Sequence, residues 1–254
     1  MHEYLETLNL RLEDRYRGDC PVCAGKNTFT ATRTYTGILY NCYKAGCRIG
    51  GTQSTTITVE DMKYKMNKQS NKSIFTLPDY FIPNRTEVQE WANQYGLDAN
   101  NINLLYDVRE NRVVFPVEHN SKYVDATGRS LNIKQKPKWK RYGVSSFAYT
   151  CGKGEIAVVV EDCISAAVVS SISSKATGVA LMGTSLMSDH VAQLQKYSKV
   201  IVSLDPDARN KTLTFTQQLR STVGTSVVAA LNTKDDLKYR KKDDIFNLNL
   251  LLSY

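Results

Sequence analysis

From residue 155 onward the chain alternates short β-branched runs with segments of helical length, and this alternation constrains the fold more than any other feature. Runs of about four to eight residues rich in Val and Ile, separated by helical segments, are typical of βαβ units. We expect strands at 156–160, 178–182, 200–204 and 226–230, and helices at 164–173, 188–197 and 208–222. Since such units connect by right-handed crossovers, this part of the chain predicts a parallel sheet covered by helices.

Acidic residues follow three of the expected strands. Glu161 comes after the first strand, Asp205 and Asp207 follow the third on either side of a proline, and Asp235 and Asp236 come after the fourth. Because the carboxyl ends of parallel strands meet at one edge of a sheet, where ligands usually bind, we expect a carboxylate cluster there. The alternative is that the Asp-Pro-Asp sequence only ends a strand and caps the next helix.

Such a cluster predicts a divalent metal ion, because carboxylates held close together repel one another unless cations neutralise them. Mg²⁺ and Mn²⁺ prefer oxygen ligands, whereas zinc prefers thiolate and imidazole ligands. A magnesium or manganese site favours phosphoryl transfer, in which the ion activates a hydroxyl nucleophile and stabilises a pyrophosphate leaving group. A merely structural cation is the alternative.

Two close cysteine pairs near the N-terminus have the spacing of a structural zinc site. Eighteen residues separate the two pairs. Segments 28–34 and 38–41, which lie between the pairs, suit the two strands of a zinc ribbon. The alternative, a reduced thiol cluster without metal, is unfavourable because a segment of about fifty residues has little core of its own. We expect one zinc ion bound by Cys20, Cys23, Cys42 and Cys47.

The basic composition indicates an anionic partner. Lys and Arg number 33 against 25 Asp and Glu, which gives a net charge of +8, and cations concentrate at 134–141 and 238–242. Trp139 and Tyr142 lie in or beside the first of these segments. Cations interleaved with aromatic rings suit the phosphates and stacked bases of nucleic acid or nucleotides. A solvated basic loop is the alternative.

The sequence predicts a soluble protein of several parts. It contains no apolar run of the roughly 18 to 20 residues that span a bilayer and no signal peptide, so its six cysteines favour metal binding over disulfides. We expect a zinc-binding ribbon at 1–55, a linker at 56–78, a basic subdomain at 79–152, and an α/β domain at 153–254.

Motifs in the second half resemble those of a TOPRIM domain. They are VEDCISA at 160–166, ALMGTSL at 180–186 and LDPD at 204–207. Preceded by a Cys-Pro-x-Cys ribbon, by RVVFPV at 112–117 and by a Gly-Arg pair at 128–129, they make the chain similar to bacterial-type DNA primases, above all to the primase half of phage primase-helicases. The resemblance implies an α/β fold with a TOPRIM parallel-sheet core, an N-terminal zinc ribbon and a small basic α+β subdomain.

The resemblance also implies roles for single residues. It makes Glu161, Asp205 and Asp207 the catalytic residues and magnesium ligands, with Asp235 as a further magnesium ligand. It makes the four cysteines the zinc ligands of a domain that helps to read the template start site. The basic residues that it implies in binding template and nucleotides are Arg112, Arg129 and Lys138.

Two positions depart from the family pattern. Asp162 stands where the family has glycine, which adds negative charge beside the site, and Ser165 stands where the family has an acid. The sequence also lacks a Gly-x-x-x-x-Gly-Lys-Ser/Thr phosphate loop, so we expect no attached helicase and a separate helicase as partner.

Together these features predict a DNA primase. Such an enzyme is a nucleotidyltransferase that makes short RNA primers on single-stranded DNA from ribonucleoside triphosphates, here with structural Zn²⁺ and catalytic Mg²⁺ or Mn²⁺. We expect it in the cytoplasm, that of a host cell if the source is a bacteriophage, and without a membrane partner. Two alternatives stay open: a TOPRIM-type nuclease, and a non-catalytic zinc-bearing protein that binds single-stranded DNA or replication proteins.

Overall fold

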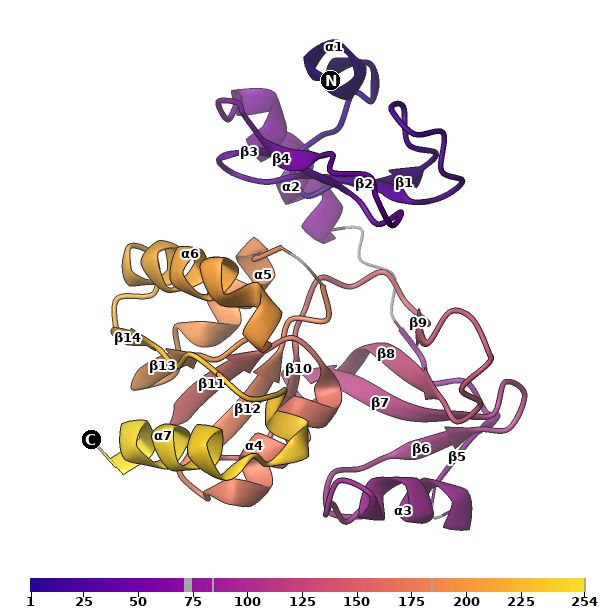
Figure 1. The fold of residues 1–254 in the computed structure, drawn as a ribbon, viewed down its shortest axis with the longest axis vertical. Coiled ribbons are helices and arrows are strands. Elements are labelled where there is room, and N and C mark those ends of the chain that lie inside the picture. Colours follow the sequence, from indigo (N-terminus) through magenta and orange to yellow (C-terminus); the bar gives the residue numbers. More distant parts are fainter. Residues whose placement is uncertain (71–74, 84, 184, 254) are drawn as a thin grey trace. The chain divides into compact units, whose positions relative to one another are not determined.

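The computed structural model describes residues 1–70, 75–83, 85–183 and 185–253, without the side chains of 65–70. Residues 71–74 of the expected linker and Thr184 of the second TOPRIM-like motif therefore lie outside the described residues. The chain forms two compact units, residues 1–73 and 74–254 (Figure 1). Among the described residues no helix is long and apolar enough to cross a membrane.

The first unit is built on a four-stranded antiparallel sheet. After the short helix α1 (His2–Thr7), its strands follow in the order β1 (Arg15–Gly18), β2 (Phe29–Arg33), β3 (Gly37–Cys42) and β4 (Gly50–Ser54). Leu5 packs with Phe29 and Ile38 in a small core that also contains Cys20 and Cys42. The two ribbon strands expected from the sequence are β2 and β3, and β1 and β4 extend the sheet on either side.

A helix, α2 (Val59–Ser70), occupies much of the segment that the sequence suggested as a linker. Thr58 and Asp61 cap the start of this helix with two reciprocal hydrogen bonds. The Thr58 N–H donates to Asp61 Oδ2 at 3.0 Å, and the Asp61 N–H donates to Thr58 Oγ1 at 3.1 Å. The buried Arg33 guanidinium also donates to Asp61 Oδ2 at 3.4 Å. This capping pattern, together with an ion pair, explains how so polar a segment forms a helix in the first unit.

The second unit contains an antiparallel five-stranded sheet. Its strands lie in chain order: β5 (Phe81–Pro83), β6 (Leu105–Asp107), β7 (Arg112–His119), β8 (Lys122–Ser130) and β9 (Trp139–Arg141). β7 and β8 form an antiparallel hairpin, and β7 contains the RVVFPV segment at 112–117. Helix α3 (Thr86–Asn93) packs against this sheet through Trp91, whose ring centre lies 6.0 Å from that of Phe115.

The other sheet of the second unit is the one predicted from the β/α alternation. Its strands lie in the order β10 (Tyr149–Cys151), β12 (Ala176–Ala180), β11 (Ile156–Val160), β13 (Lys199–Val202) and β14 (Ser226–Ala229). β11 to β14 are mutually parallel, and the edge strand β10 is antiparallel to β12. The expected mixed α/β fold with a parallel-strand sheet is therefore confirmed, with one antiparallel strand added.

Helices cover both faces of this sheet (Figure 1). Apolar residues of α4 (Cys163–Ile172) and α7 (Lys242–Ser253) pack with one face, and those of α5 (Ser188–Leu194) and α6 (Arg209–Arg220) with the other. Because β11 is covered on both faces, all five of its residues are buried, as a continuous apolar run predicts. Two short 3₁₀ helices, η1 (Pro206–Ala208) and η2 (Leu237–Tyr239), follow β13 and β14.

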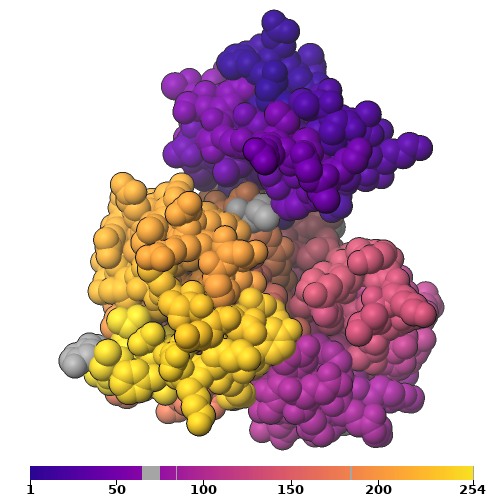
Figure 2. All heavy atoms as spheres, viewed as in Figure 1, coloured from indigo at the N-terminus to yellow at the C-terminus, as the bar shows by residue number. Residues whose placement is uncertain are grey.

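Arg240 connects the two sheets of the second unit. Its guanidinium donates to Tyr95 O at 3.1 Å and to Gly96 O at 3.2 Å, just beyond α3, and to Ser171 Oγ of α4 at 2.8 Å. Figure 2 shows the yellow C-terminal segment meeting the magenta segment that contains α3. The segment that follows β14 is therefore fixed against both parts of the unit.

Candidate functional site

Three aspartates come together at the carboxyl edge of the parallel sheet. Asp162 lies just after β11, Asp205 just after β13, and Asp236 after β14. Each offers one carboxylate oxygen, and these oxygens lie within 4.8 Å of one another. We call Asp162, Asp205 and Asp236 the acidic edge. Their placement follows from the topology, because parallel strands deliver their C-terminal residues to the same side.

The structure groups the acids somewhat differently from the sequence expectation. Glu161 and Asp207 lie beside the acidic edge: Glu161 Oε1 is 3.6 Å from Lys211 Nζ, and burial together with nearby Asp207 raises the pKa of Glu161. The Asp235 carboxylate lies 3.8 Å from the Lys241 ammonium. Asp236, not Asp235, therefore belongs to the acidic edge together with Asp205.

Asp162, the acid that replaces the family glycine, has two structural partners. Its Oδ1 accepts hydrogen bonds from the N–H groups of Ile164 and Ser165, both at 2.9 Å, and so caps α4. Its Oδ2 lies 2.8 Å from Lys238 Nζ. An aspartate directly before a helical segment is a capping signal, and this signal could have assigned Asp162 from the sequence.

Asp205 is a member of the acidic edge whose pKa differs from that of an ordinary aspartate. Burial, with Asp236 and Glu161 nearby, raises the pKa of Asp205 to about 7. Burial and the neighbouring acids both disfavour the ionised carboxylate, and a bound cation would favour it. Oxygen donors with excess negative charge fit Mg²⁺ or Mn²⁺. The residues present therefore fit the divalent ion that the resemblance implies.

Two side chains hold the loops of the acidic edge. The buried Asp244 carboxylate accepts hydrogen bonds from the N–H groups of Thr233 at 2.9 Å, Lys234 at 3.1 Å and Asp235 at 3.3 Å. Asn232 Nδ2 donates to Leu204 O at 2.8 Å and so joins the loop after β14 to the loop after β13. Sequence reasoning missed both residues, because their partners depend on how the loops fold.

Cations of the antiparallel sheet lie beside the acidic edge. Burial lowers the pKa of Arg129, which interacts electrostatically with Asp162, and the Arg129 guanidinium carbon lies 5.4 Å from the Trp139 ring centre. Burial and neighbouring Arg129 also lower the pKa of Lys138, which interacts with Asp162 and Asp236. The structure therefore brings Arg129 and Lys138 next to the acids, as an anion- or nucleotide-binding wall would require.

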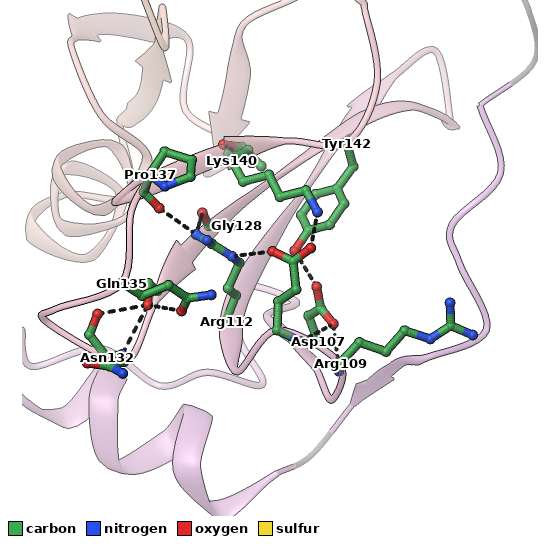
Figure 3. A network of polar contacts seen from close by, with 12 residues as sticks. Asp107, Arg109, Arg112, Gly128, Asn132, Gln135, Pro137, Lys140 and Tyr142 are labelled. Atoms are coloured by element: carbon green, nitrogen blue, oxygen red, sulfur yellow. Dashed lines mark hydrogen bonds and ion pairs between the residues drawn. The ribbon is translucent and has the colours of Figure 1, made fainter.

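Arg112, in contrast, is enclosed by protein groups (Figure 3). It is 1% exposed, its Nε donates to Glu110 Oε2 at 3.0 Å, and its Nη1 donates to Pro137 O at 3.0 Å. Lys140 contacts the same Glu110 carboxylate. Arg112 is thus not brought together with the acidic edge but holds the loop that leads to Lys138.

The four cysteines converge in the first unit. Their sulfur atoms lie within 4.8 Å of one another, with Cys20 Sγ 4.0 Å from Cys47 Sγ and Cys23 Sγ 3.7 Å from Cys42 Sγ. Tetrahedral zinc with Zn–S bonds of about 2.3 Å separates its sulfurs by about 3.8 Å, which matches these distances. A hydrogen bond with Thr28 lowers the pKa of Cys42 to about 6, toward the thiolate that metal binding needs. The cluster therefore fits zinc.

No protein-family model matches the chain, and no curated protein matches it. Solved structures do match. The zinc-binding and RNA polymerase domains of the Aquifex aeolicus primase are 17% identical, with 99% of this chain and 82% of that chain covered and a TM-score of 0.56. The DnaG primase catalytic domain bound to ssDNA is 14% identical, with 65% and 71% covered and a TM-score of 0.52.

The primase fragment of the bacteriophage T7 primase-helicase protein also matches, at 12% identity with 94% of this chain and 99% of that chain covered and a TM-score of 0.48. The two stronger likenesses show the fold. The chain has a primase-type fold that extends over both the zinc-binding and the RNA polymerase domains of the Aquifex protein. The expected resemblance to primases is therefore confirmed for the fold.

Proposed function

We propose that the chain is a DNA primase, which synthesises short RNA primers on single-stranded DNA from ribonucleoside triphosphates. One observation carries the proposal: in a primase-type fold, three carboxylates meet at the end of the parallel sheet, and Arg129 and Lys138 lie beside them. Nucleotidyl transfer needs this combination, because acids hold the divalent ion while cations bind the triphosphate.

The acids would hold Mg²⁺ or Mn²⁺. Asp205 is the ligand with the strongest case, because its pKa is raised to about 7 and a cation would relieve that repulsion. Asp236 offers an oxygen within 4.8 Å of an oxygen of Asp205, and Glu161 and Asp207 interact electrostatically with this group. When bound, such an ion lowers the pKa of a primer 3′-hydroxyl and neutralises charge on the triphosphate. We retain Glu161, Asp205 and Asp207 as catalytic residues and replace Asp235 with Asp236.

The basic residues of the antiparallel sheet would bind the anionic reactants. Arg129 and Lys138 would pair with triphosphate or template phosphate oxygens, since ammonium and guanidinium groups form short charge-assisted hydrogen bonds with phosphate. Arg112 supports this role indirectly, because it fixes the Pro137 carbonyl one residue before Lys138. Trp139, next to Arg129, offers a flat ring for a base.

The first unit would bind zinc and contact the template. Zinc held by Cys20, Cys23, Cys42 and Cys47 would staple a small core, and the surrounding ribbon would help to select the start site on single-stranded DNA. A separate replicative helicase would supply the single strand, and the host cytoplasm would be the place of action if the source is a phage.

A primer-synthesis assay tests the proposal. Zinc-loaded protein, Mg²⁺ or Mn²⁺, labelled ribonucleotides and single-stranded templates of varied sequence should give template-dependent oligoribonucleotides. Asp205→Asn should reduce the product at least about 100-fold, because a metal-ion contribution of several kcal/mol is removed at about 1.4 kcal/mol for each tenfold. Asp243→Asn is the matched control, since Asp243 is exposed and pairs with Lys234 away from the acidic edge.

Other outcomes separate the alternatives. Cleavage of DNA or RNA without nucleotides, lost in Asp205→Asn, would identify a nuclease. Binding of single-stranded DNA with no metal-dependent product of either kind would identify a non-catalytic binder. Equal primer yields from wild type and Asp205→Asn would contradict the assignment of the site.

A further inference from the structure

Lys238 places an ammonium group inside the acidic edge. Its Nζ lies 2.8 Å from Asp162 Oδ2 and also contacts Asp236 Oδ2. Oxygens of these two carboxylates lie within 4.8 Å of an oxygen of Asp205. Lysine is ordinarily charged at neutral pH, and two carboxylates face this ammonium, so Lys238 carries a positive charge here. A cation is therefore already part of the cluster.

The backbone holds Lys238 in this position from both sides. Leu237, directly before it, is 1% exposed and belongs to the core, and Arg240, two residues later, is anchored to Tyr95 and Ser171. The η2 segment is thus fixed in place rather than a loose loop.

Asp162 is fully engaged while Lys238 is present. One carboxylate oxygen caps α4 through two N–H groups, and the other faces the ammonium. A metal ion could take Asp162 as a ligand only by displacing Lys238 or by sharing an oxygen with it. Among the described residues, Lys238 lies at ion-pair distance from Asp162 and Asp236 and not from Asp205, so the Asp205 carboxylate is the one left for a metal ion.

Charge balance points the same way. The Lys238 ammonium faces the carboxylates of Asp162 and Asp236, so the carboxylate charge left for a divalent ion lies on the side of Asp205. A second divalent ion would stand within a few ångströms of both the first ion and the lysine, where like charges repel strongly. The positive charge of Lys238 therefore takes the place of a second metal ion.

We propose that Lys238 is a built-in counter-cation, which limits the acidic edge to one divalent ion on its Asp205 side. The inference deepens the proposed function, because it concerns the same metal site and rests on it. Asp162 and Lys238 act as a pair. Lys238 balances the charge of the additional acid, Asp162, and this ion pair takes the place of a second metal ion. Lys238 is a positioning residue that sets how many ions bind.

Counting bound Mn²⁺ on the zinc-loaded full chain, by electron paramagnetic resonance and by calorimetry, tests this directly. The wild type should bind one ion and Lys238→Met two. Lys238→Arg, which keeps the charge, should bind one. The double variant Asp162→Asn with Lys238→Met should return to one ion, because asparagine keeps the helix cap and the pair's two charges leave together. Lys241→Met is the matched control and should bind one, since Lys241 pairs with Asp235 outside the acidic edge.

The outcomes distinguish this inference from the proposed function. Two ions on the wild type, or one ion on Lys238→Met whose tryptophan fluorescence shows a folded second unit, would overturn the role of Lys238. No ion on the wild type would overturn the metal site itself. The expected counts without primer synthesis in any assay would support Lys238 and overturn the primase activity.

Discussion

Asp244, in the first turn of α7, accepts hydrogen bonds from both the N–H and the hydroxyl of Thr233, at 2.9 and 3.2 Å. Its second oxygen accepts from the next two N–H groups. One buried carboxylate therefore shapes the loop that leads to Asp236. The geometry of the acidic edge depends on a residue that touches neither metal nor nucleotide.

The variant Asp244→Asn should weaken this loop. An amide can keep one accepting oxygen, but its NH₂ group would face the N–H groups of Lys234 and Asp235, so the second unit should lose about 2 to 3 kcal/mol of stability. Both tryptophans, Trp91 and Trp139, lie in the second unit, so urea unfolding followed by tryptophan fluorescence measures this loss. Mn²⁺ affinity should fall as well, while Asp243→Asn should leave both quantities near wild type. Unchanged stability in Asp244→Asn would refute the positioning role.

The pKa of Asp205 predicts a pH dependence of stability in buffer without added Mg²⁺ or Mn²⁺. An ordinary aspartate has a pKa of about 3.9, whereas that of Asp205 in the folded chain is raised to about 7, so the folded state binds more protons between these values. The stability of the second unit should therefore fall as pH rises from about 4 to 7. Added Mg²⁺ should restore it above pH 7.

Asp205→Asn provides the check on this prediction. The variant should be more stable than wild type at pH 8 without divalent ions. It should lose the part of the pH dependence of stability that comes from Asp205, and Mg²⁺ should no longer stabilise it. Measurement by urea unfolding at pH 5 and pH 8 is sufficient. If wild type and Asp205→Asn showed the same change in stability between pH 5 and pH 8, Asp205 would ionise with its ordinary pKa.

Removing zinc should unfold the first unit selectively. Its core is small and contains two of the zinc ligands, so the metal is expected to supply much of its stability. Cys20→Ser should lose the zinc ion, measured by metal analysis, and should expose first-unit amides to hydrogen exchange. Cys163→Ala, which changes a buried cysteine of the second unit, should retain one zinc ion. Zinc retention by Cys20→Ser at full stoichiometry would contradict the four-cysteine site.

Arg112 and Arg129 should give opposite phenotypes. Arg112→Met removes a buried guanidinium from Glu110, which keeps Lys140 as a partner, and from the Pro137 carbonyl, and it should destabilise the second unit by about 1 to 3 kcal/mol. Arg129→Ala removes a cation beside the acidic edge and should raise the KM for nucleotides with little change in unfolding. If Arg112→Met instead raised the KM at unchanged stability, Arg112 would have to be assigned to nucleotide binding.

Local patterns predicted the framework of the molecule well. The β-branched runs became β11 to β14 because strands covered on both faces need continuous apolar residues, and the rule that parallel strands end together placed Asp205 near the other acids. The cysteine spacing likewise predicted the sulfur cluster. These features depend on short sequence signals and on topology alone.

Side-chain direction could not be predicted in the same way. Asp235 and Asp236 are neighbours in sequence, yet the Asp244 contacts turn Asp236 toward Asp205 while Asp235 lies by Lys241. The position of Lys238 depends on how η2 packs, 76 residues along the chain from Asp162. In contrast, the helix α2 had a readable signal in Thr58 and Asp61, which its polar composition obscured.

The capping aspartate at position 162 has a consequence for how sequences of this kind can diverge. A glycine there would remove the ammonium's partner at 2.8 Å, and a neutral residue at 238 would leave the aspartate's outer oxygen without its cation. Either change alone disturbs the charge of the site, whereas both together preserve it. We therefore expect residues 162 and 238 to covary among homologues, with the acid and the lysine gained or lost as one evolutionary unit.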